Sequence, residues 1–351
     1  MRKFTYDESI YQNLSSDIVN LLSEIHEYKG KHSNVANLKP DILANMLKTA
    51  KIQSTGASNR IEGIFTSDAR LKSIVSENAT PLNRSENEIT GYRDVLTTIH
   101  ENYEHIPITK NTLLQLHRDL YKYAPLGLGG NFKSSDNIIE ETTLSGEKIV
   151  RFKPVSAFET PDSINSLCEQ YNKAMDIKKV NPLILTYVFI LDFLCIHPFS
   201  DGNGRISRLL TLLSLYKSSY DVGKYISIER IIEKTKDSYY DSLQKSSLGW
   251  HDSKNDYNHF LKYMLEVTLM TYKEFDKRIG HITDPSIKLS KPARIKKLFS
   301  DSLSRLSKSD ILEKCPDISK VTVEKTLGKL LKEDYILKIG KGRAIKYTKS
   351  S

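Results

Sequence analysis

The residues whose types and spacing could do chemistry lie in one stretch, 197–208, which reads His-Pro-Phe-Ser-Asp-Gly-Asn-Gly-Arg-Ile-Ser-Arg. His197 has an ordinary pKa that allows it to accept a proton at neutral pH. Asp201 offers a hard oxygen ligand for Mg²⁺. Arg205 and Arg208 are three positions apart, so both would lie on one face of a helix and could bind a polyphosphate. The stretch therefore predicts a base beside a phosphate site.

Two apolar segments flank this stretch and must position it. Asn181 and Pro182 supply an N-cap and a first-turn proline, and residues 183–196 are almost entirely apolar, as in a helix buried on all sides. After the stretch, leucines recur at helical spacing as far as Tyr216, which predicts a second buried helix. The glycines between them would lie at a helix start, where free backbone N–H groups and the helix dipole favour an anion.

The motif His-Pro-Phe-x-Asp-Gly-Asn-Gly-Arg-x-x-Arg resembles the signature of the Fic (filamentation induced by cAMP) family, and every defined position is filled. Members of that family mostly transfer AMP from ATP to a protein hydroxyl. The resemblance implies that His197 deprotonates the target hydroxyl, that Asp201 holds Mg²⁺ and that Arg208 anchors the γ-phosphate. It also implies that the rest of the nucleotide's phosphates are bound by Gly202, Asn203, Gly204 and Arg205. The alternative is a polar turn between two core helices, with a histidine whose hydrogen bonds are satisfied.

An upstream pattern places Ser58 and Glu62 four positions apart, directly before Gly63. Alone this pattern is weak, because any helix end can show it. It resembles the inhibitory motif of the Fic family, (Ser/Thr)-x-x-x-Glu-(Gly/Asn). The resemblance implies that Glu62 pairs with Arg208, withdraws it from the γ-phosphate and leaves ATP in an unreactive pose. The alternative is a solvated glutamate at a helix end.

Two short β-capable runs, 137–140 and 148–153, predict a hairpin. A hairpin of this kind resembles the flap of Fic proteins, which implies that Ile138 and Ile139 dock the target segment by strand addition. Lys133 stands where the family's preceding element has Arg, which leaves open which target is docked. The alternative is a surface hairpin without a role.

A helix predicted around 224–245 contains Tyr239 and Tyr240. It resembles the family's helix that lines the adenine side, so both tyrosines are candidates for packing the base. The alternative is that they belong to the hydrophobic core.

Composition limits the class of protein. With 351 residues, 39% of them hydrophobic and 27% charged, the chain is typical of a soluble globular protein with two or three domains. The longest apolar run, 183–196, is short and contains Asp192, so we expect no signal peptide, no membrane span and a cytoplasmic protein. The 3 cysteines lack metal-ligand spacing, which predicts neither disulfides nor a zinc site.

The net charge of +9 is concentrated near the C-terminus, because residues 288–351 hold 17 Lys and Arg against 7 Asp and Glu. Three predicted helices followed by a basic hairpin resemble a winged helix, which implies a third helix in the major groove of DNA. The alternative is a winged helix for protein contacts or dimerisation. The excess of positive charge favours DNA.

The expected fold class is mainly α: a Fic helical domain with a small β-hairpin flap, plus a C-terminal winged helix-turn-helix domain. The expected parts are an N-terminal helical region with the inhibitory motif (1–107), a Fic catalytic core (108–278), a linker (279–291) and a winged-helix domain (292–351).

The expected function is an ATP- and Mg²⁺-dependent protein adenylyltransferase that modifies a Ser, Thr or Tyr hydroxyl, with the chain itself as one candidate target. Two alternatives remain: a hydrolase in which Glu62 orients a water to remove AMP, and a DNA-binding regulator with a nucleotide-sensing core. The sequence leaves open the target protein, the nucleotide preference and whether the chain forms a homodimer.

Overall fold

The structure of the chain is a computed structural model that describes residues 2–32, 40–124, 127–142, 148–283, 290–301, 305–340, 342 and 345–349. The turn that joins the two strands of the expected hairpin (143–147) lies outside the described residues, as do residues 284–289 of the expected linker 279–291.

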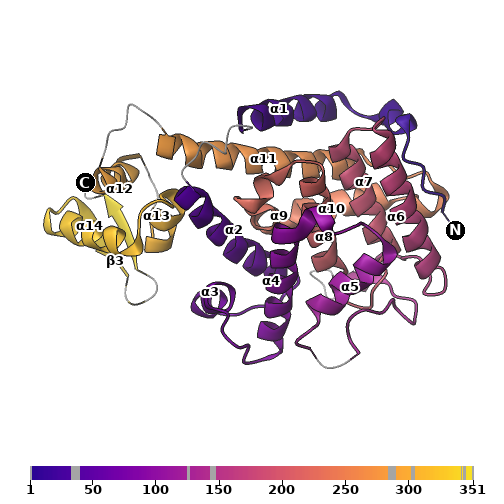
Figure 1. Cartoon of the computed structure of the whole chain (residues 1–351), viewed down its shortest axis with the longest axis horizontal. Helices are drawn as coiled ribbons and strands as arrows, with labels where there is room; N and C mark the ends of the chain where they lie inside the picture. The colour runs from indigo at the N-terminus through magenta and orange to yellow at the C-terminus, as the bar shows by residue number, and fades with distance from the viewer. Residues whose placement is uncertain are drawn as a thin grey trace. The chain divides into compact units, whose positions relative to one another are not determined.

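The described residues are mainly helical, with two short hairpins (Figure 1). The helices are α1 (Ser16–His32), α2 (Pro40–Ile61), α3 (Asp68–Glu77), α4 (Arg84–Asn102), α5 (Lys110–Leu120), α6 (Thr160–Ile177), α7 (Pro182–Ile196), α8 (Asn203–Lys217), α9 (Ile228–Lys234), α10 (Lys236–Ser247), α11 (Asn258–Thr283), α12 (Lys291–Asp301), α13 (Lys308–Lys314) and α14 (Lys320–Lys332). The strands are β1 (Ile139–Thr142), β2 (Lys148–Phe152), β3 (Ile336–Ile339) and β4 (Lys346–Lys349).

The chain divides into two compact units. The first contains residues 1–31 and 50–272, and the second contains 32–49 and 273–351. Most of the expected N-terminal region therefore lies in the same unit as the expected catalytic core. Helix α11 continues to Thr283, which is inside the segment expected as a linker.

Helices α7 and α8 form the centre of the first unit. The side chain of Asn181 accepts a hydrogen bond from the backbone N–H of Leu183, which starts α7 as the sequence predicts. Because nearly every side chain of α7 is apolar, the helix is buried on all sides, between α6 and α8 (Figure 1). This packing fixes the loop that joins α7 to α8.

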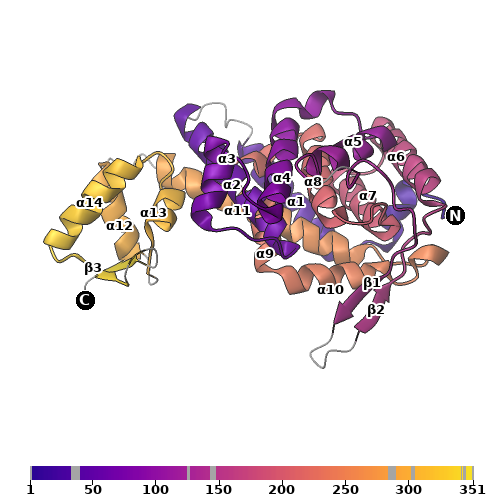
Figure 2. The ribbon, with the colours of Figure 1, turned by 90° about the horizontal axis from the view of Figure 1, so that it is seen from below.

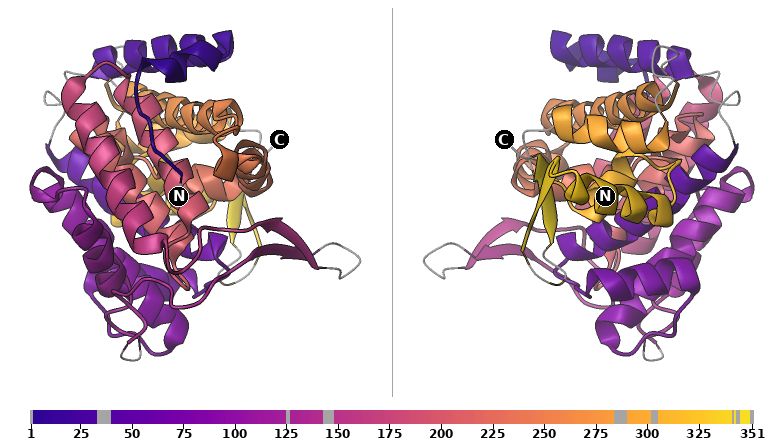
Figure 3. Two further views of the ribbon diagram at one scale, coloured as in Figure 1. Left: turned by 90° about the vertical axis from the view of Figure 1, so that its right-hand side faces the viewer. Right: turned by 90° about the vertical axis from the view of Figure 1, so that its left-hand side faces the viewer.

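The first hairpin, β1–β2, is antiparallel, with Glu140 opposite Val150 and a bulge between Ile139 and Glu140. Strand β2 contacts α10 (Figure 2), and the two strands extend away from the helices of the first unit (Figure 3). The predicted hairpin is therefore present, next to the helix that carries Tyr239.

The second unit contains its own hydrophobic core, built from α12, α13, α14 and the hairpin β3–β4. Leu306, between α12 and α13, pairs with Tyr347 of β4, so a third short extended segment joins the hairpin. The winged helix itself stays a prediction. Among the described residues, no helix combines the length and the apolar character that crossing a membrane requires.

Candidate active site

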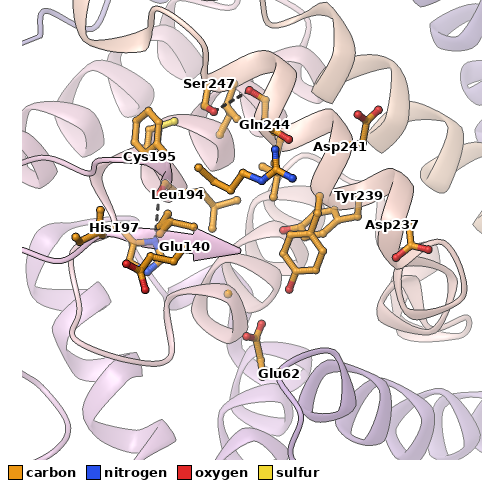
Figure 4. Close-up of a pocket in the computed structure, with 18 of the residues that line it drawn as sticks. Glu62, Glu140, Leu194, Cys195, His197, Asp237, Tyr239, Asp241, Gln244 and Ser247 are labelled. Carbon is orange, nitrogen blue, oxygen red and sulfur yellow. Dashed lines mark hydrogen bonds between the residues drawn. The ribbon is translucent and has the colours of Figure 1, made fainter. Parts of the chain in front are cut away.

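A cavity of about 860 Å³ lies in the first unit, between the end of α2, the β1–β2 hairpin, α7, α8 and α10. Figure 4 shows His197, Tyr239 and Glu62 around it. The cavity brings together many of the residues that the sequence singles out: Glu62, Ile138, Ile139, His197, Gly204, Arg208, Tyr239 and Tyr240. Its size is that of a site for a drug-sized or nucleotide-sized ligand.

His197 is the residue that ends α7, in a left-handed conformation with φ 50°. Its Nδ1 lies 3.3 Å from the carbonyl oxygen of Leu194. Because a carbonyl only accepts, this contact assigns the proton to Nδ1 and leaves the lone pair on Nε2. Burial, together with the nearby charge of Lys133, lowers the pKa of His197 to about 4. The imidazole is therefore neutral at neutral pH and able to accept a proton.

Asn203 holds the loop by a pair of hydrogen bonds. Its Oδ1 accepts from the backbone N–H of Phe199 at 2.9 Å, and its Nδ2 donates to the carbonyl of Phe199 at 2.7 Å. Gly202 precedes α8 with φ 83°, and a Cβ there would lie 3.1 Å from the ring of Tyr121. The side chain of Asn203 thus positions the loop, which leaves backbone N–H groups at the start of α8 for the predicted phosphate contact.

His117, in α5, is a residue that sequence reasoning missed. Its ring stacks on Phe199, with 3.8 Å between the centroids and 5° between the planes. Nδ1 accepts the backbone N–H of Gly130 at 3.0 Å, so Nε2 carries the proton and donates to the carbonyl of Asp201 at 3.1 Å. Burial lowers the pKa of His117 to about 4, which keeps this neutral tautomer. His117 therefore connects the loop to two other segments, and no local motif indicates it.

Lys133 also makes contacts that its position in the sequence does not predict. Its Nζ donates to the carbonyl of Ile196 at 3.1 Å and to Oδ1 of Asn137 at 2.9 Å. Burial lowers the pKa of Lys133 to about 8. The lysine that replaces the family's arginine thus joins the end of α7 to the base of the hairpin.

Arg205 lies outside the residues that line the cavity. Its guanidinium, which is 1% exposed, donates to Glu88 at 2.7 Å and to the hydroxyl of Tyr121 at 2.8 Å. A buried arginine needs such partners, because an unpaired charge would be costly there. The structure therefore places Arg205 among α4, α5 and α8 as a support of the loop, while the resemblance implies a phosphate contact. Nothing in the sequence near Glu88 or Tyr121 marks them as its partners.

Arg208 is connected to the end of α2. Its Nε donates to Oγ of Ser58 at 2.8 Å, and its Nη2 donates to the carbonyl of Ser58 at 2.9 Å and to Oε1 of Glu62 at 2.8 Å. Burial opposes the charge of Arg208, but the carboxylate of Glu62 raises its pKa above the ordinary value. Its Nη1 is buried and has no acceptor among the described residues. The contact implied between Glu62 and Arg208 is thus present.

Gly204 allows that contact to form. A Cβ at this position would lie 2.2 Å from Oε1 of Glu62, so a larger residue would displace the carboxylate. The backbone of Gly204 is in the first turn of α8, where its close approach to Glu62 depends on the missing side chain.

Asp201 has an exposed side chain, 68% accessible, beside the loop. Its Oδ1 accepts the backbone N–H of Gly202 at 2.6 Å, while Oδ2 lies 3.9 Å from Arg205. Among the described residues, no group of three or more His, Cys, Asp or Glu could hold a metal alone. A single carboxylate still fits Mg²⁺ when phosphates and water supply the other oxygens. Asp201 is the residue that would hold such an ion.

Tyr239 and Tyr240 line the cavity in different ways. Tyr239 is buried and packs against Phe260 and Tyr263, so it also belongs to the core. Tyr240 is 44% exposed, with its ring 5.3 Å from that of Tyr239. The face of Tyr240 is the more accessible surface for a base.

Residues 107–215 match the profile of the Fic/DOC family. A Fic domain protein from Desulfovibrio desulfuricans matches in fold, with a TM-score of 0.60, 19% identity and 97% of each chain covered. Residues 107–215 of this chain therefore form a Fic domain. A second Fic structure, from Bacteroides thetaiotaomicron, gives a TM-score of 0.58 at 24% identity, over 74% of this chain and 96% of that one.

Curated relatives match shorter parts of this chain, at slightly higher sequence identity. A Fido domain-containing protein of Dictyostelium discoideum is 27% identical over 140 residues, 39% of this chain and 87% of its own. The protein adenylyltransferase Fic of Aedes aegypti is 26% identical over 233 residues, 64% of this chain. The match spans 41% of the length of that mosquito protein. Fic-type activity therefore has support from relatives, while the reaction of this chain is a separate question.

Proposed function

We propose that this Fic domain protein transfers AMP from ATP to a hydroxyl of a protein, and that Glu62 holds the activity low. One observation carries the proposal: a neutral, partly buried His197 shares a nucleotide-sized cavity with Arg208, whose guanidinium is bound by Glu62.

The reaction follows from the placement of the loop. The hydroxyl of the target loses its proton to Nε2 of His197 as its oxygen bonds to the α-phosphorus of ATP. The bond from that phosphorus to the oxygen of the β-phosphate breaks, and pyrophosphate leaves. Backbone N–H groups at the start of α8 favour the negative charge of the phosphates. Mg²⁺, held through Asp201, would neutralise the charge of the departing pyrophosphate.

Arg208 is the group through which activity is limited. Its Nη1 has no acceptor among the described residues, while its Nε and Nη2 are bound by Ser58 and Glu62. With Glu62 in place, the guanidinium cannot also turn toward a γ-phosphate, so the α-phosphorus would be poorly aligned for in-line attack. Displacement of Glu62 would free Arg208 and permit transfer.

The test is incubation of the purified chain with Mg²⁺ and ATP labelled on either the α- or the γ-phosphate. We expect protein-bound label from α-labelled ATP alone, because AMP retains that phosphate. His197→Ala should reduce transfer by about 100-fold or more, since it removes the base. Asp201→Ala should remove the dependence on Mg²⁺ together with activity.

Transfer near the wild-type rate in His197→Ala would contradict the proposal. Removal of AMP from an adenylylated protein by the wild type, lost in Glu62→Gly, would instead favour the hydrolase alternative.

A further inference from the structure

Helix α14 of the second unit carries a positive face that the first unit's activity does not use. On one side Val323, Leu327 and Leu330 are buried in the core with α12 and α13. On the other side a stripe of exposed residues follows at helical spacing, Val321, Lys325, Gly328 and Lys332, and Lys320 begins the helix. The exposed face is therefore small and basic.

The acidic residues near this face are engaged within the unit. Glu324 pairs with Lys308 at 3.1 Å, and Asp317 pairs with Arg294 at 2.6 Å. Asp310 is part of the capping box that starts α13. In contrast, Lys320, Lys325 and Lys332 make no ion pair within the described part of the chain. Their charges remain available to an anionic partner.

Gly328 is an independent indication that another surface can approach the backbone of α14 closely. Glycine inside a helix is destabilising relative to alanine. A Cβ at Gly328 would meet no atom within 4 Å, so packing inside the protein does not require the glycine. An exposed glycine at the middle of the basic stripe leaves room for another surface to reach the helix backbone.

The order of elements brings α14 into the position of a recognition helix. Helix α13 is followed by α14 after residues 315–319, α14 packs on both α12 and α13, and the hairpin β3–β4 follows. In helix-turn-helix proteins the second helix of such a pair enters the major groove. Lys338, Lys346 and Lys349 on the hairpin are exposed as well and add positive charge to the same unit.

We propose that α14 docks in the major groove of duplex DNA, with Lys320, Lys325 and Lys332 on phosphates and Gly328 at the closest approach. The groove of B-DNA admits an α-helix, whereas the major groove of A-form RNA is too deep and narrow. The partner is therefore duplex DNA, and a protein surface or duplex RNA is an outcome of the test.

The experiment measures binding of the full chain to a fluorescent 25-base-pair DNA duplex by anisotropy, between 50 and 200 mM KCl. A variant with Lys320→Ala, Lys325→Ala and Lys332→Ala should bind more weakly, and the slope of log K against log salt should fall in magnitude by about 2.7. The matched control replaces three exposed lysines of the first unit, Lys72, Lys173 and Lys254, by alanine and should bind as the wild type does.

Gly328→Leu tests groove entry apart from charge. Its side chain enters open space, so the melting temperature should not fall, while DNA affinity should drop about tenfold or more. No DNA binding at 50 mM KCl, equal losses in both triple variants, or preference for duplex RNA of the same length would overturn the proposal. Unchanged affinity in Gly328→Leu would overturn it too.

Discussion

The two sides of the cavity are built differently. On the side of the α7–α8 loop, Asn203 and Arg205 are 2% and 1% exposed, and the amide of Asn203 and the two terminal nitrogens of Arg205 are bonded within the protein. On the opposite side, Glu62 is 30% exposed and Ile138 of the hairpin is 55% exposed. The loop side is therefore fixed by buried hydrogen bonds, whereas the Glu62 and hairpin side can change without breaking the core.

This difference separates catalysis from control. Groups whose position must be precise, His197 and the start of α8, lie on the fixed side. His197 is bonded to the carbonyl of Leu194, and Asn203 at the start of α8 is bonded to Phe199. The group proposed to control activity, Glu62, reaches Arg208 from a helix end that borders the cavity. Changes on the two sides should consequently have different effects on stability and on activity.

The largest loss of stability is expected from Asn203→Ala. The substitution leaves the buried N–H of Phe199 without its acceptor, while the carbonyl of Phe199 keeps a bond from Asn137. We expect the free energy of unfolding to fall by about 2 to 3 kcal/mol, measured by urea denaturation. Asn131→Ala, at an exposed asparagine, is the control and should change it by less than about 0.5 kcal/mol. If Asn203→Ala also lowers the free energy of unfolding by less than about 0.5 kcal/mol, the two hydrogen bonds between Asn203 and Phe199 do not fix the loop.

A second effect on the fixed side concerns pH. The pKa of His117 is about 4 in the folded chain and near 6.5 when unfolded, so the unfolded chain takes up a proton first as pH falls. Stability should be full above pH 6.5 and should be lost progressively toward pH 4, by about 1.4 kcal/mol for each unit of the pKa difference.

The measurement is the free energy of unfolding at intervals from pH 7 to pH 4.5. His117→Gln, which cannot take up that proton, should reduce this pH dependence, although His197 and His100, with lowered pKa values of about 4 and about 3, keep part of it. His259→Gln, at a half-exposed histidine, is the control and should leave the slope unchanged. An equal slope in wild type and His117→Gln would contradict the buried, neutral assignment.

The smallest effect on stability is expected on the open side. Ile138→Ser changes an exposed residue, so the free energy of unfolding should stay within about 0.5 kcal/mol of the wild type. If the hairpin docks the target, the same change should lower AMP transfer from α-labelled ATP to protein, by up to about tenfold. Unchanged transfer would remove the proposed docking role of the hairpin.

The same contrast explains how much the sequence could reveal. The apolar run of α7, the cap at Asn181 and the loop motif are local patterns, and the structure has the helices where they predict them. The contact of Glu62 with Arg208 was implied by the resemblance of two short motifs to those of the Fic family, although the motifs are far apart in the chain. These features depend on few residues at fixed spacing.

The supports of the loop could not be predicted, because they depend on tertiary packing. Glu88, His117 and Tyr121 lie in α4 and α5 or just after them, and each is an ordinary helical residue until the fold places it beside the loop. Arg205 belongs to the motif, yet its partners come from those helices, so spacing alone could not show that it is buried. The role of Lys133 was hidden for the same reason, since its acceptors are the end of α7 and Asn137.

The proposed inhibition is carried by Glu62, whose carboxylate lies 2.8 Å from Arg208. The measurement is incorporation of label from α-labelled ATP into the chain, compared between wild type, Glu62→Gly and the double variant Glu62→Gly with Arg208→Ala. Asp237→Ala, which removes another carboxylate at the cavity, is the matched control.

We predict that Glu62→Gly raises incorporation about tenfold or more, because recovery of about 1.4 kcal/mol of transition-state binding is enough for that factor. The double variant should lose the gain, and Asp237→Ala should not show it. Incorporation that is the same in Glu62→Gly and wild type would contradict the account.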